Sequence, residues 1–283
     1  MIYFLKLVLA LAACFAAQKA AIHALGGPST KSESNYFSSI ARIQESASAP
    51  AHVLLLGSSL TGRLPDRGDG FAGVANLGCD GGSAVDTLRA LDRGLIPAAP
   101  ILVIEGNTLF KAQAGQTSGV GEAMSKPWFK AGLQFPAVAA GARPSGLAYT
   151  TIRSRKFGRA EGPDGPSLPV QPSPSILTEP ISLNNDDQRE LLKELAQITN
   201  RLTARGHRLL LIILPPGAPP DSPNQKIPRA WAQMSAVPLI DLTEGLPPGS
   251  LSYTDGIHLA PASAAATLRS IMEAVDQLPA TAR

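Results

Sequence analysis

A serine-containing turn and a distant Asp-His pair have the residue types that nucleophilic catalysis needs. The turn reads Gly57-Ser58-Ser59-Leu60, and the pair lies in Asp255-Gly256-Ile257-His258 near the other end of the chain. Together the two runs supply a hydroxyl nucleophile, a base and a carboxylate that orients the base. These residue types indicate covalent catalysis at a serine.

The residues around the serine turn predict where it lies in the fold. The run Val53-Leu54-Leu55-Leu56 is wholly apolar and is typical of a strand. The small residues that follow it then place Ser59 at the carboxyl edge of a sheet, where the next helix can direct its positive dipole end at an attacking oxygen. Nucleophilic sites of α/β folds are usually built at this edge.

Apolar runs alternate with helical patterns through most of the chain. We expect strands at residues 52–56, 74–77, 101–104, 209–214 and 239–242, and helices at residues 84–93, 186–205, 229–235 and 261–274. Continuous apolar strands that alternate with helices predict a parallel sheet with both faces covered. The expected fold is therefore α/β, a three-layer α/β/α sandwich of about five parallel strands.

The N-terminal residues have the composition of an export or anchoring segment. Residues 1–25 are read as a signal peptide or membrane anchor, because residues 7–17 are almost wholly apolar before Gln18 and Lys19. Cys14 follows Leu-Ala-Ala, which offers a lipid-attachment box as an alternative. Each interpretation predicts an extracytoplasmic, periplasmic or secreted protein, with membrane association through this segment.

The rest of the chain is expected to form one domain behind a tether. Residues 26–50 are rich in Ser, Ala and Gly and are read as the tether, and residues 51–283 as the catalytic domain. An insertion at 108–185 interrupts the strand-helix alternation. Its Trp128 and Phe129 are candidate substrate-binding residues, because aromatic faces suit sugar stacking. A substrate-covering lid and a solvated basic loop remain equal interpretations of this segment.

Charge, cysteines and histidines argue against several other classes of protein. The formal charge of +3 is too small to favour a nucleic-acid partner, and no basic-aromatic stripe is present in the sequence. The chain has two cysteines and four scattered histidines, without the spacing of metal ligands. We therefore expect neither a metal nor another cofactor.

Four short motifs in order resemble the conserved blocks of the SGNH or GDSL hydrolases. Residues 57–60 resemble the Gly-Asp-Ser-Leu block, and Asn76-Leu77-Gly78 looks like the second block. Glu105-Gly106-Asn107 resembles the third, and residues 255–258 are similar to the fifth. The set spans roughly residues 52–275, and it implies the flavodoxin-like sandwich of that family.

The resemblance also implies roles for individual residues. Ser59 would be the nucleophile, His258 the base, and Asp255 the carboxylate that orients His258. The backbone N–H groups of Ser59 and Gly78 and the side-chain amide of Asn107 would form the oxyanion hole. Each residue taken alone could be a helix cap or a turn residue. The occurrence of all of them in the order of the family favours the catalytic interpretation.

The motifs depart from the family pattern at three positions. Ser58 replaces the usual Asp of the first block, so the choice of Ser59 over Ser58 depends on the alignment of that block. Glu105 stands where the third block has Gly, and Thr108 replaces the Asp that ends it. This form resembles divergent members that handle acyl groups on extracellular polysaccharides.

Three functions follow as hypotheses. The first is a serine esterase that hydrolyses acyl, foremost acetyl, esters of carbohydrates or small molecules. The second is a polysaccharide O-acetyltransferase with the same triad, because the sequence does not separate water from a sugar hydroxyl as acceptor. The third is a non-catalytic glycan-binding module on the same fold. The expected partner is accordingly an ester-bearing small molecule or polysaccharide.

Overall fold

The computed structural model describes residues 1–24, 30, 32, 34–113, 119–157, 162–170, 173–179, 181, 183 and 185–279. Within these ranges five strands form one sheet in the order β2-β1-β3-β4-β5, and every neighbouring pair is parallel. The strands are β1 (Val53–Gly57), β2 (Val74–Gly78), β3 (Ile101–Glu105), β4 (Arg208–Ile213) and β5 (Leu239–Asp241). This order is the flavodoxin-like arrangement of a doubly wound sheet.

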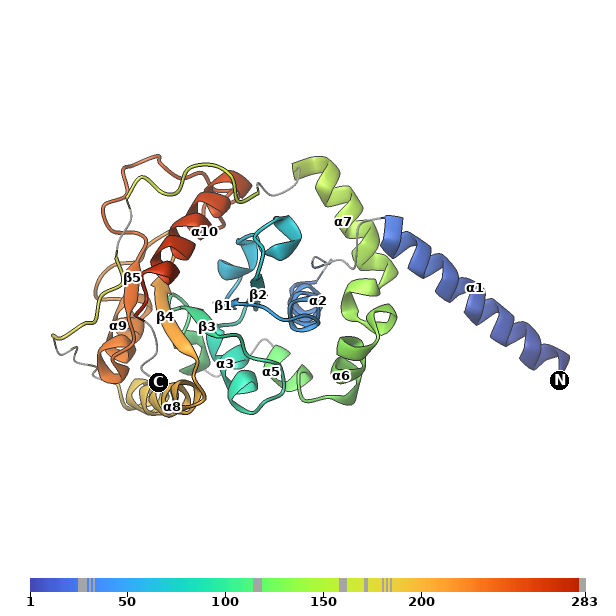
Figure 1. Cartoon of the computed structure of the whole chain (residues 1–283), viewed down its shortest axis with the longest axis horizontal. Helices are drawn as coiled ribbons and strands as arrows, with labels where there is room; N and C mark the ends of the chain where they lie inside the picture. Colours follow the sequence, from blue (N-terminus) through green and yellow to red (C-terminus); the bar gives the residue numbers. More distant parts are fainter. Residues whose placement is uncertain are drawn as a thin grey trace.

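Helices cover both faces of the sheet, which confirms the three-layer sandwich (Figure 1). Leu54 and Leu56 of β1 belong to a buried cluster that includes residues of the helices α3 (Ala84–Asp92), α8 (Asp186–Ala204) and α9 (Pro223–Ser235). Val53 and Leu55 belong to a second cluster with α10 (Pro261–Asp276). Successive side chains of a strand point to opposite faces, so a fully apolar strand can feed two separate cores.

Every expected strand is present, with its ends shifted by no more than one residue. The largest difference among the four expected helices is at α9, which begins at Pro223 and includes Pro228. A proline inside a helix costs a backbone hydrogen bond, so the sequence favoured a later start. The ring of Pro228 packs against Gly106, where a Cβ would lie 2.4 Å from the ring.

The expected tether at residues 26–50 is wrong for most of its described length. Residues Asn35–Ala47 form α2, which packs on β2 and buries Ile40 and Ile43 completely. Polar residues of α2 are buried as well. One of them, Ser46, exchanges hydrogen bonds with the backbone of Asn76, which offsets the cost of its burial. A helix whose buried face contains Ser, Arg and Gln has the composition of a linker, and composition therefore misled the prediction.

The first half of the insertion is a helical cap, defined as residues 110–157 without the undescribed 114–118. It comprises α4 (Phe110–Gln113), α5 (Val120–Ala123), α6 (Pro127–Gln134), the turns Pro136–Val138 and Ala140–Ala142, and α7 (Pro144–Phe157). The cap packs on α2, where Gln44 bonds the carbonyl of Phe129 and the N–H of Ala140. The cap is thus part of the folded domain, which contradicts the solvated-loop interpretation of this half and leaves the lid interpretation untested.

The second half of the insertion runs across α10 as an extended strap. Arg269 of α10 donates to three backbone carbonyls of the strap, those of Gly162, Asp164 and Pro166. Farther along, Ser175 pairs antiparallel with Leu239 of β5. The described part of the strap is therefore fixed to the domain by backbone hydrogen bonds.

The N-terminal helix α1 (Ile2–Ala24) extends away from the domain (Figure 1). None of its residues is buried, although its side chains are mostly apolar. It is long and apolar enough to cross a membrane, and a signal sequence has the same properties. The residues expected to form the leader are thus a continuous apolar helix, which is compatible with a signal sequence or an anchor.

Candidate active site

The strand order places the serine turn at the switch point, where the chain stops adding strands on one side of β1 and begins to add them on the other. From β1 the chain moves to β2 at one edge, and it then returns past β1 to β3, β4 and β5. Ligands of open α/β sheets bind at the carboxyl ends of the strands beside such a switch point. Ser59 lies two residues beyond the end of β1, and this topology therefore exposes its side chain at the usual position of a site.

Ser59, His258 and Asp255 form a continuous chain of hydrogen bonds. The distance from His258 Nε2 to Ser59 Oγ is 2.9 Å, and that from His258 Nδ1 to Asp255 Oδ2 is 2.7 Å. A carboxylate only accepts hydrogen bonds, so Nδ1 carries the hydrogen toward Asp255. In the neutral ring Nε2 is then an acceptor, and it faces the serine hydroxyl as a base must.

The loop before α10 determines the orientation of the imidazole. Asp255 Oδ1 accepts the backbone N–H of His258 at 2.8 Å and that of Ile257 at 3.2 Å. The hydrogen bonds from the backbone and ring of His258 lower the pKa of Asp255 well below its usual range. A bridge between Tyr253 and Leu259 closes the base of this loop. The histidine is therefore positioned by the loop that carries it.

The two adjacent serines have different partners. The hydroxyl of Ser58 is buried and donates to the carboxylate of Glu105 at 2.8 Å. Ser59 is partly exposed, and its hydroxyl meets His258. Of the two serines, only Ser59 therefore forms a hydrogen bond with His258.

Glu105 is the residue that the sequence singled out only as a departure from the family pattern. Its carboxylate is completely buried and accepts bonds from the N–H and hydroxyl of both Ser58 and Thr61, and from the hydroxyl of Thr108. A Cβ on Gly57 would lie 2.5 Å from Glu105 Oε2, so only glycine leaves space for this carboxylate. Glu105 thus fastens the turn that presents Ser59. The sequence signal for this role was the position of Glu105, a charged residue at the end of an otherwise apolar strand.

The expected oxyanion donors are arranged differently from the prediction. The N–H of Ser59 has no acceptor among the described residues, which suits the expected role. The N–H of Gly78, however, donates to Asn76 Oδ1 at 2.9 Å, so Gly78 does not offer it to a ligand. The side chain of Asn76 takes the N–H of Gly78, two residues away, in place of a ligand. The prediction of Gly78 as an oxyanion donor is therefore wrong.

Asn107 is held by a reciprocal pair of bonds with Leu214. Its Nδ2 donates to the carbonyl of Leu214 and its Oδ1 accepts the N–H of Leu214, both at 2.8 Å. The residue is buried, and the pair ties the end of β3 to the chain leaving β4. One N–H of Nδ2 remains beyond this pair, because a primary amide has two.

A neighbouring glycine offers a backbone donor that the sequence reasoning missed. In the turn after β2, the N–H groups of Cys79, Asp80 and Gly82 are used within the protein. The N–H of Gly81 has no acceptor among the described residues, and Gly81 is exposed with φ of 80°. The Gly81-Gly82 pair was the available signal, since such a φ favours glycine.

A buried arginine fixes the turn that follows β2. Arg42 of α2 donates to the carbonyl of Gly78 and pairs with Asp80 at 3.2 Å. Burial of Arg42 shields the pair from water and strengthens it. Both turns at this edge, after β1 and after β2, are therefore fixed by buried charged groups.

The two aromatic residues expected to bind substrate lie in α6 of the cap. Phe129 is completely buried, so its ring is not available to a sugar and that prediction is wrong. Its ring packs edge-on to that of Trp128, with centroids 6.3 Å apart. Trp128 keeps 45% of its surface exposed. The side chains of Arg153 and Arg155, part of the basic character of the insertion, lie outside the described atoms.

A hollow of about 250 Å³ lies at the carboxyl ends of β4 and β5. It is lined by Pro215, Pro216 and Gly217 after β4 and by the segment from Thr243 to Tyr253, two residues before Asp255. The wall is mainly proline, leucine and glycine with the Tyr253 ring. This hollow is on the same edge of the sheet as the triad.

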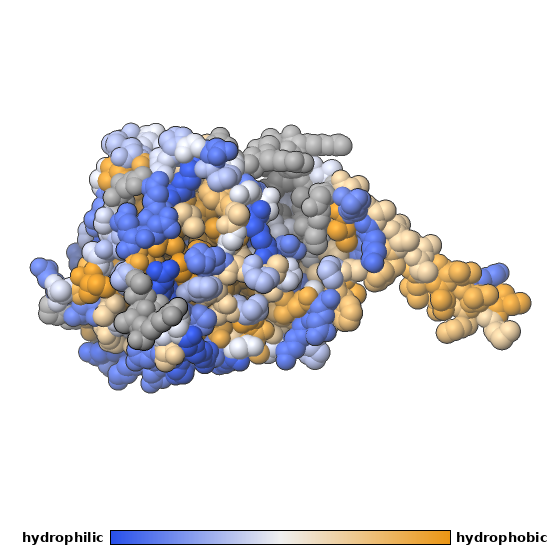
Figure 2. Space-filling model, in the orientation of Figure 1, coloured by the Kyte–Doolittle hydropathy of each residue, from blue (hydrophilic) through white to orange (hydrophobic). Residues whose placement is uncertain are grey.

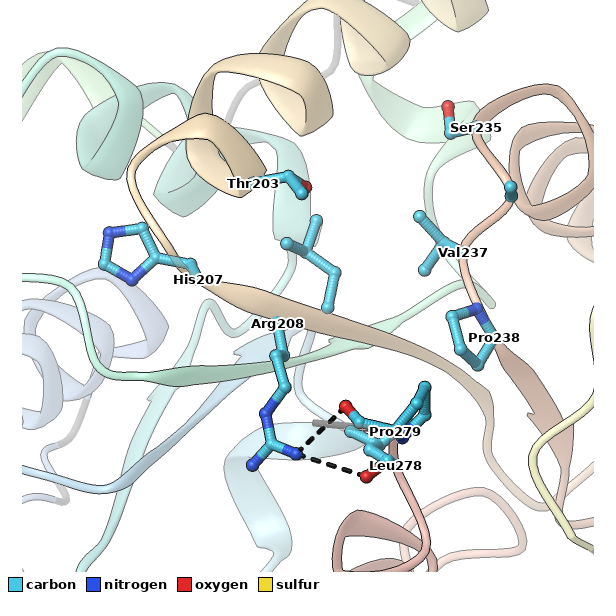
Figure 3. A pocket seen from close by; sticks show the side chains of 10 residues that line it. Thr203, His207, Arg208, Ser235, Val237, Pro238, Leu278 and Pro279 are labelled. Carbon is cyan, nitrogen blue, oxygen red and sulfur yellow. Dashed lines mark hydrogen bonds between the residues drawn. The ribbon is translucent and has the colours of Figure 1, made fainter. Parts of the chain in front are cut away.

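A second hollow, of about 210 Å³, lies at the opposite edge (Figure 3). Its wall includes Thr203, His207 and Arg208 where β4 begins, and Figure 3 shows Arg208 bonded to the carbonyls of Leu278 and Pro279. His207 bonds the carbonyl of Ala99 through Nδ1, which gives it a structural role. This hollow is therefore separate from the triad.

Other candidate chemistry has little support in the described part of the chain. Cys79 is completely buried, and burial raises the pKa of its thiol, so a reactive thiolate is not formed there. No group of three His, Cys, Asp or Glu residues there could hold a metal ion.

Comparison with known proteins adds no relative. No family model, no curated protein and no solved structure matches the chain. The resemblance of its motifs to the SGNH hydrolases therefore stays an expectation, and the function depends on the geometry of the site.

Proposed function

We propose that the protein is a serine esterase that hydrolyses small acyl esters, acetyl foremost, on carbohydrates or small molecules. The single observation that carries this proposal is the hydrogen-bonded chain from Ser59 through His258 to Asp255. A hydroxyl nucleophile, a correctly oriented imidazole and an ionised carboxylate are the groups that acyl transfer at a serine uses.

The reaction follows from this chain. Ser59 Oγ attacks the ester carbonyl carbon as its proton passes to His258 Nε2. The bond to the alcohol oxygen then breaks, and His258 returns the proton to the departing alcohol. Water attacks the acyl-serine with His258 again as base, and the acid leaves as Ser59 regains its proton. Asp255 keeps its charge and stabilises the imidazolium in both halves.

Backbone amides supply the stabilisation of the tetrahedral oxygen in this proposal. The N–H groups of Ser59 and Gly81 are the candidates, with the second N–H of Asn107 Nδ2 as a third. One well-aimed donor of this kind contributes about 3–4 kcal/mol to the transition state. Glu105 acts through the turn as a positioning residue, because its bonds to Ser58 and Thr61 flank Ser59 on both sides.

A small chromogenic acetyl ester tests the proposal. We expect release of the alcohol followed by slower release of acetate when deacylation limits turnover. The matched comparison is Ser59→Ala, which should abolish both. Hydrolysis that persists in this variant at the level of the unchanged protein would contradict the proposal.

A polysaccharide O-acetyltransferase is the second candidate, favoured by the hollow beside Tyr253. A wall of mixed polarity, with prolines, Thr243, Ser250 and Tyr253, lies next to the loop of Asp255 and His258 and could seat an acceptor alcohol. The exposure of the Asp255 side chain, 52%, favours entry of water and hence hydrolysis. Partition of acetyl groups between water and an added sugar separates the two. No observation favours the non-catalytic glycan-binding module.

We also propose an extracytoplasmic location for the domain. The support is α1, whose length and apolar composition suit export or anchoring. Protease accessibility of the domain in intact cells would test this placement independently of activity.

A further inference from the structure

Besides Trp128, the cap has four large apolar side chains that keep much of their surface exposed. These are Phe135, Val138, Tyr149 and Ile152, with exposed fractions of 61%, 53%, 40% and 68%, and they are called the cap patch below. Two lie at the turn Pro136–Val138 and two lie on α7. Folded soluble surfaces scatter such residues singly, so four on two adjoining elements need an explanation.

The cap patch lies where α1 meets the domain. Gln18 of α1 donates through Nε2 to the carbonyl of Ala137 at 3.1 Å and to that of Ala142 at 2.8 Å. Contacts of α1 with the domain are made with the same turn and with α7. Figure 2 shows apolar surface along α1 and on the adjoining part of the domain. The helix and the cap patch are therefore neighbouring parts of one apolar surface.

The length of α1 determines how close the cap patch comes to a membrane that α1 enters. From Ile2 to Gln18 the helix rises about 24 Å, at 1.5 Å per residue. The hydrocarbon core of a bilayer is about 30 Å thick. With Ile2 at the far boundary of this core, the contact at Gln18 would therefore lie about 6 Å from the near boundary between lipid tails and headgroups, on the tail side. The turn bonded to Gln18 would be held at the same depth.

The residues around this contact suit the headgroup region. Lys19 follows Gln18 directly, and Lys130 is exposed on α6 of the cap. Lysine side chains favour anionic headgroups, and a tyrosine such as Tyr149 is typical of the membrane interface. Phenylalanine, valine and isoleucine contribute by burial of apolar area at the acyl boundary.

We propose that the cap patch is a lipid-facing surface that rests on the bilayer entered by α1. The helix supplies attachment and the patch supplies a second contact, so that the domain has a defined orientation to the membrane. This inference is independent of the reaction proposed for Ser59. It makes the first half of the insertion a membrane-docking element and assigns it no part in covering the triad.

The test measures contact with lipid tails at single positions of the full chain. The Cys14→Ser variant serves as background, because Cys79 is buried and unreactive. Val138→Cys carries a fluorophore in the patch, and Met234→Cys on α9 is the matched control with the same exposed fraction of 53%. The labelled proteins are reconstituted in phosphatidylcholine and phosphatidylglycerol vesicles whose tails bear bromine as quencher.

We expect severalfold stronger quenching at position 138 than at position 234. Adding Phe135→Asp to the Val138→Cys protein should reduce quenching toward the control while the thermal melt and ester hydrolysis stay unchanged. Leu9→Cys within α1 reports on insertion of the helix. Equal quenching at 138 and 234 would overturn the proposal, as would absence of quenching at Leu9→Cys. Protection of position 138 that rises with protein concentration would overturn it too, because a second copy would then cover the patch.

Discussion

The carboxyl edge of the sheet and the cap patch differ in where their side chains find partners. At the edge, Glu105 and Arg42 have partners within the chain, and His258 bonds both Asp255 and Ser59. In the cap patch, Phe135 and Ile152 keep 61% and 68% of their surface exposed. A catalytic group must be positioned before substrate arrives, whereas a docking surface is completed by its surroundings. The difference predicts that changes at the edge affect turnover and changes in the cap affect stability or attachment.

The largest expected effect is the loss of turnover in Ser59→Ala. The change removes the nucleophile and the bond to His258, and turnover of a small acetyl ester should fall by a factor on the order of 10⁴ or more. Ser125→Ala, which alters an exposed serine of the cap, is the matched control and should be unaffected. Steady-state kinetics and a thermal melt of both variants make the comparison. Comparable rates in the two variants would contradict the account.

Glu105→Gln should reduce both turnover and stability. The amide replaces one acceptor oxygen by a donor that faces the N–H and hydroxyl groups of Ser58 and Thr61. We expect about 1–3 kcal/mol less free energy of unfolding. A displaced serine turn should also lower kcat by about 10²-fold with little change in KM. Glu122→Gln, at an exposed carboxylate, is the control. A loss of stability with kcat retained would limit Glu105 to a structural role.

The rate should depend on pH through His258 alone among the triad residues. The lowered pKa of Asp255 keeps this carboxylate charged as the pH falls, so it does not lose its charge in the same window. A protonated imidazole cannot accept the proton of Ser59, so the rate should fall with acidification. The pH profile of kcat/KM for the acetyl ester measures this. A flat profile, with chemistry limiting, would remove His258 from the role of base.

The smallest effect on catalysis is expected in the cap. Phe129→Ala should destabilise the fold by about 3–5 kcal/mol, because its ring is completely buried. Trp128→Ala, at its half-exposed neighbour, should cost much less and leave hydrolysis of a small ester nearly unchanged. Denaturant unfolding and the ester assay of both variants measure these effects. A strong loss of turnover in Trp128→Ala with its stability intact would instead return the cap to the substrate site.

The strands were predictable because most are short, nearly continuous apolar runs that alternate with helical patterns, which is typical of a parallel sheet buried on both faces. Helix α2 was not predictable from composition, because its buried Ser46, Arg42 and Gln44 are balanced by bonds to residues distant in sequence. The boundaries of the cap helices were likewise obscured by interspersed Gly and Pro. Periodicity identifies apolar burial, and it misses polar burial that tertiary partners make favourable.

The site shows the same division. The order of Ser59, Asp255 and His258 along the chain indicated their association, and the structure brings them within hydrogen-bonding distance. The oxyanion prediction failed at Gly78 because a side chain two residues away takes its N–H. The role of Glu105 depends on the pairing of β3 with β1, which brings its carboxylate to the serine turn. The sequence alone does not give this pairing. Local motifs thus predicted the hydrogen-bonded group of Ser59, His258 and Asp255 but missed Glu105 and Arg42, which fix the turns at this edge.

The most direct test of the central claim is to map the covalent adduct of a serine-reactive phosphonate. Phosphonates react with a hydroxyl that a neighbouring base activates, so the adduct marks the nucleophile itself. Digestion and mass mapping of the full-length protein should place the adduct on Ser59, and Ser59→Ala should yield none. An adduct on Ser58, or no adduct in the folded protein, would contradict the account.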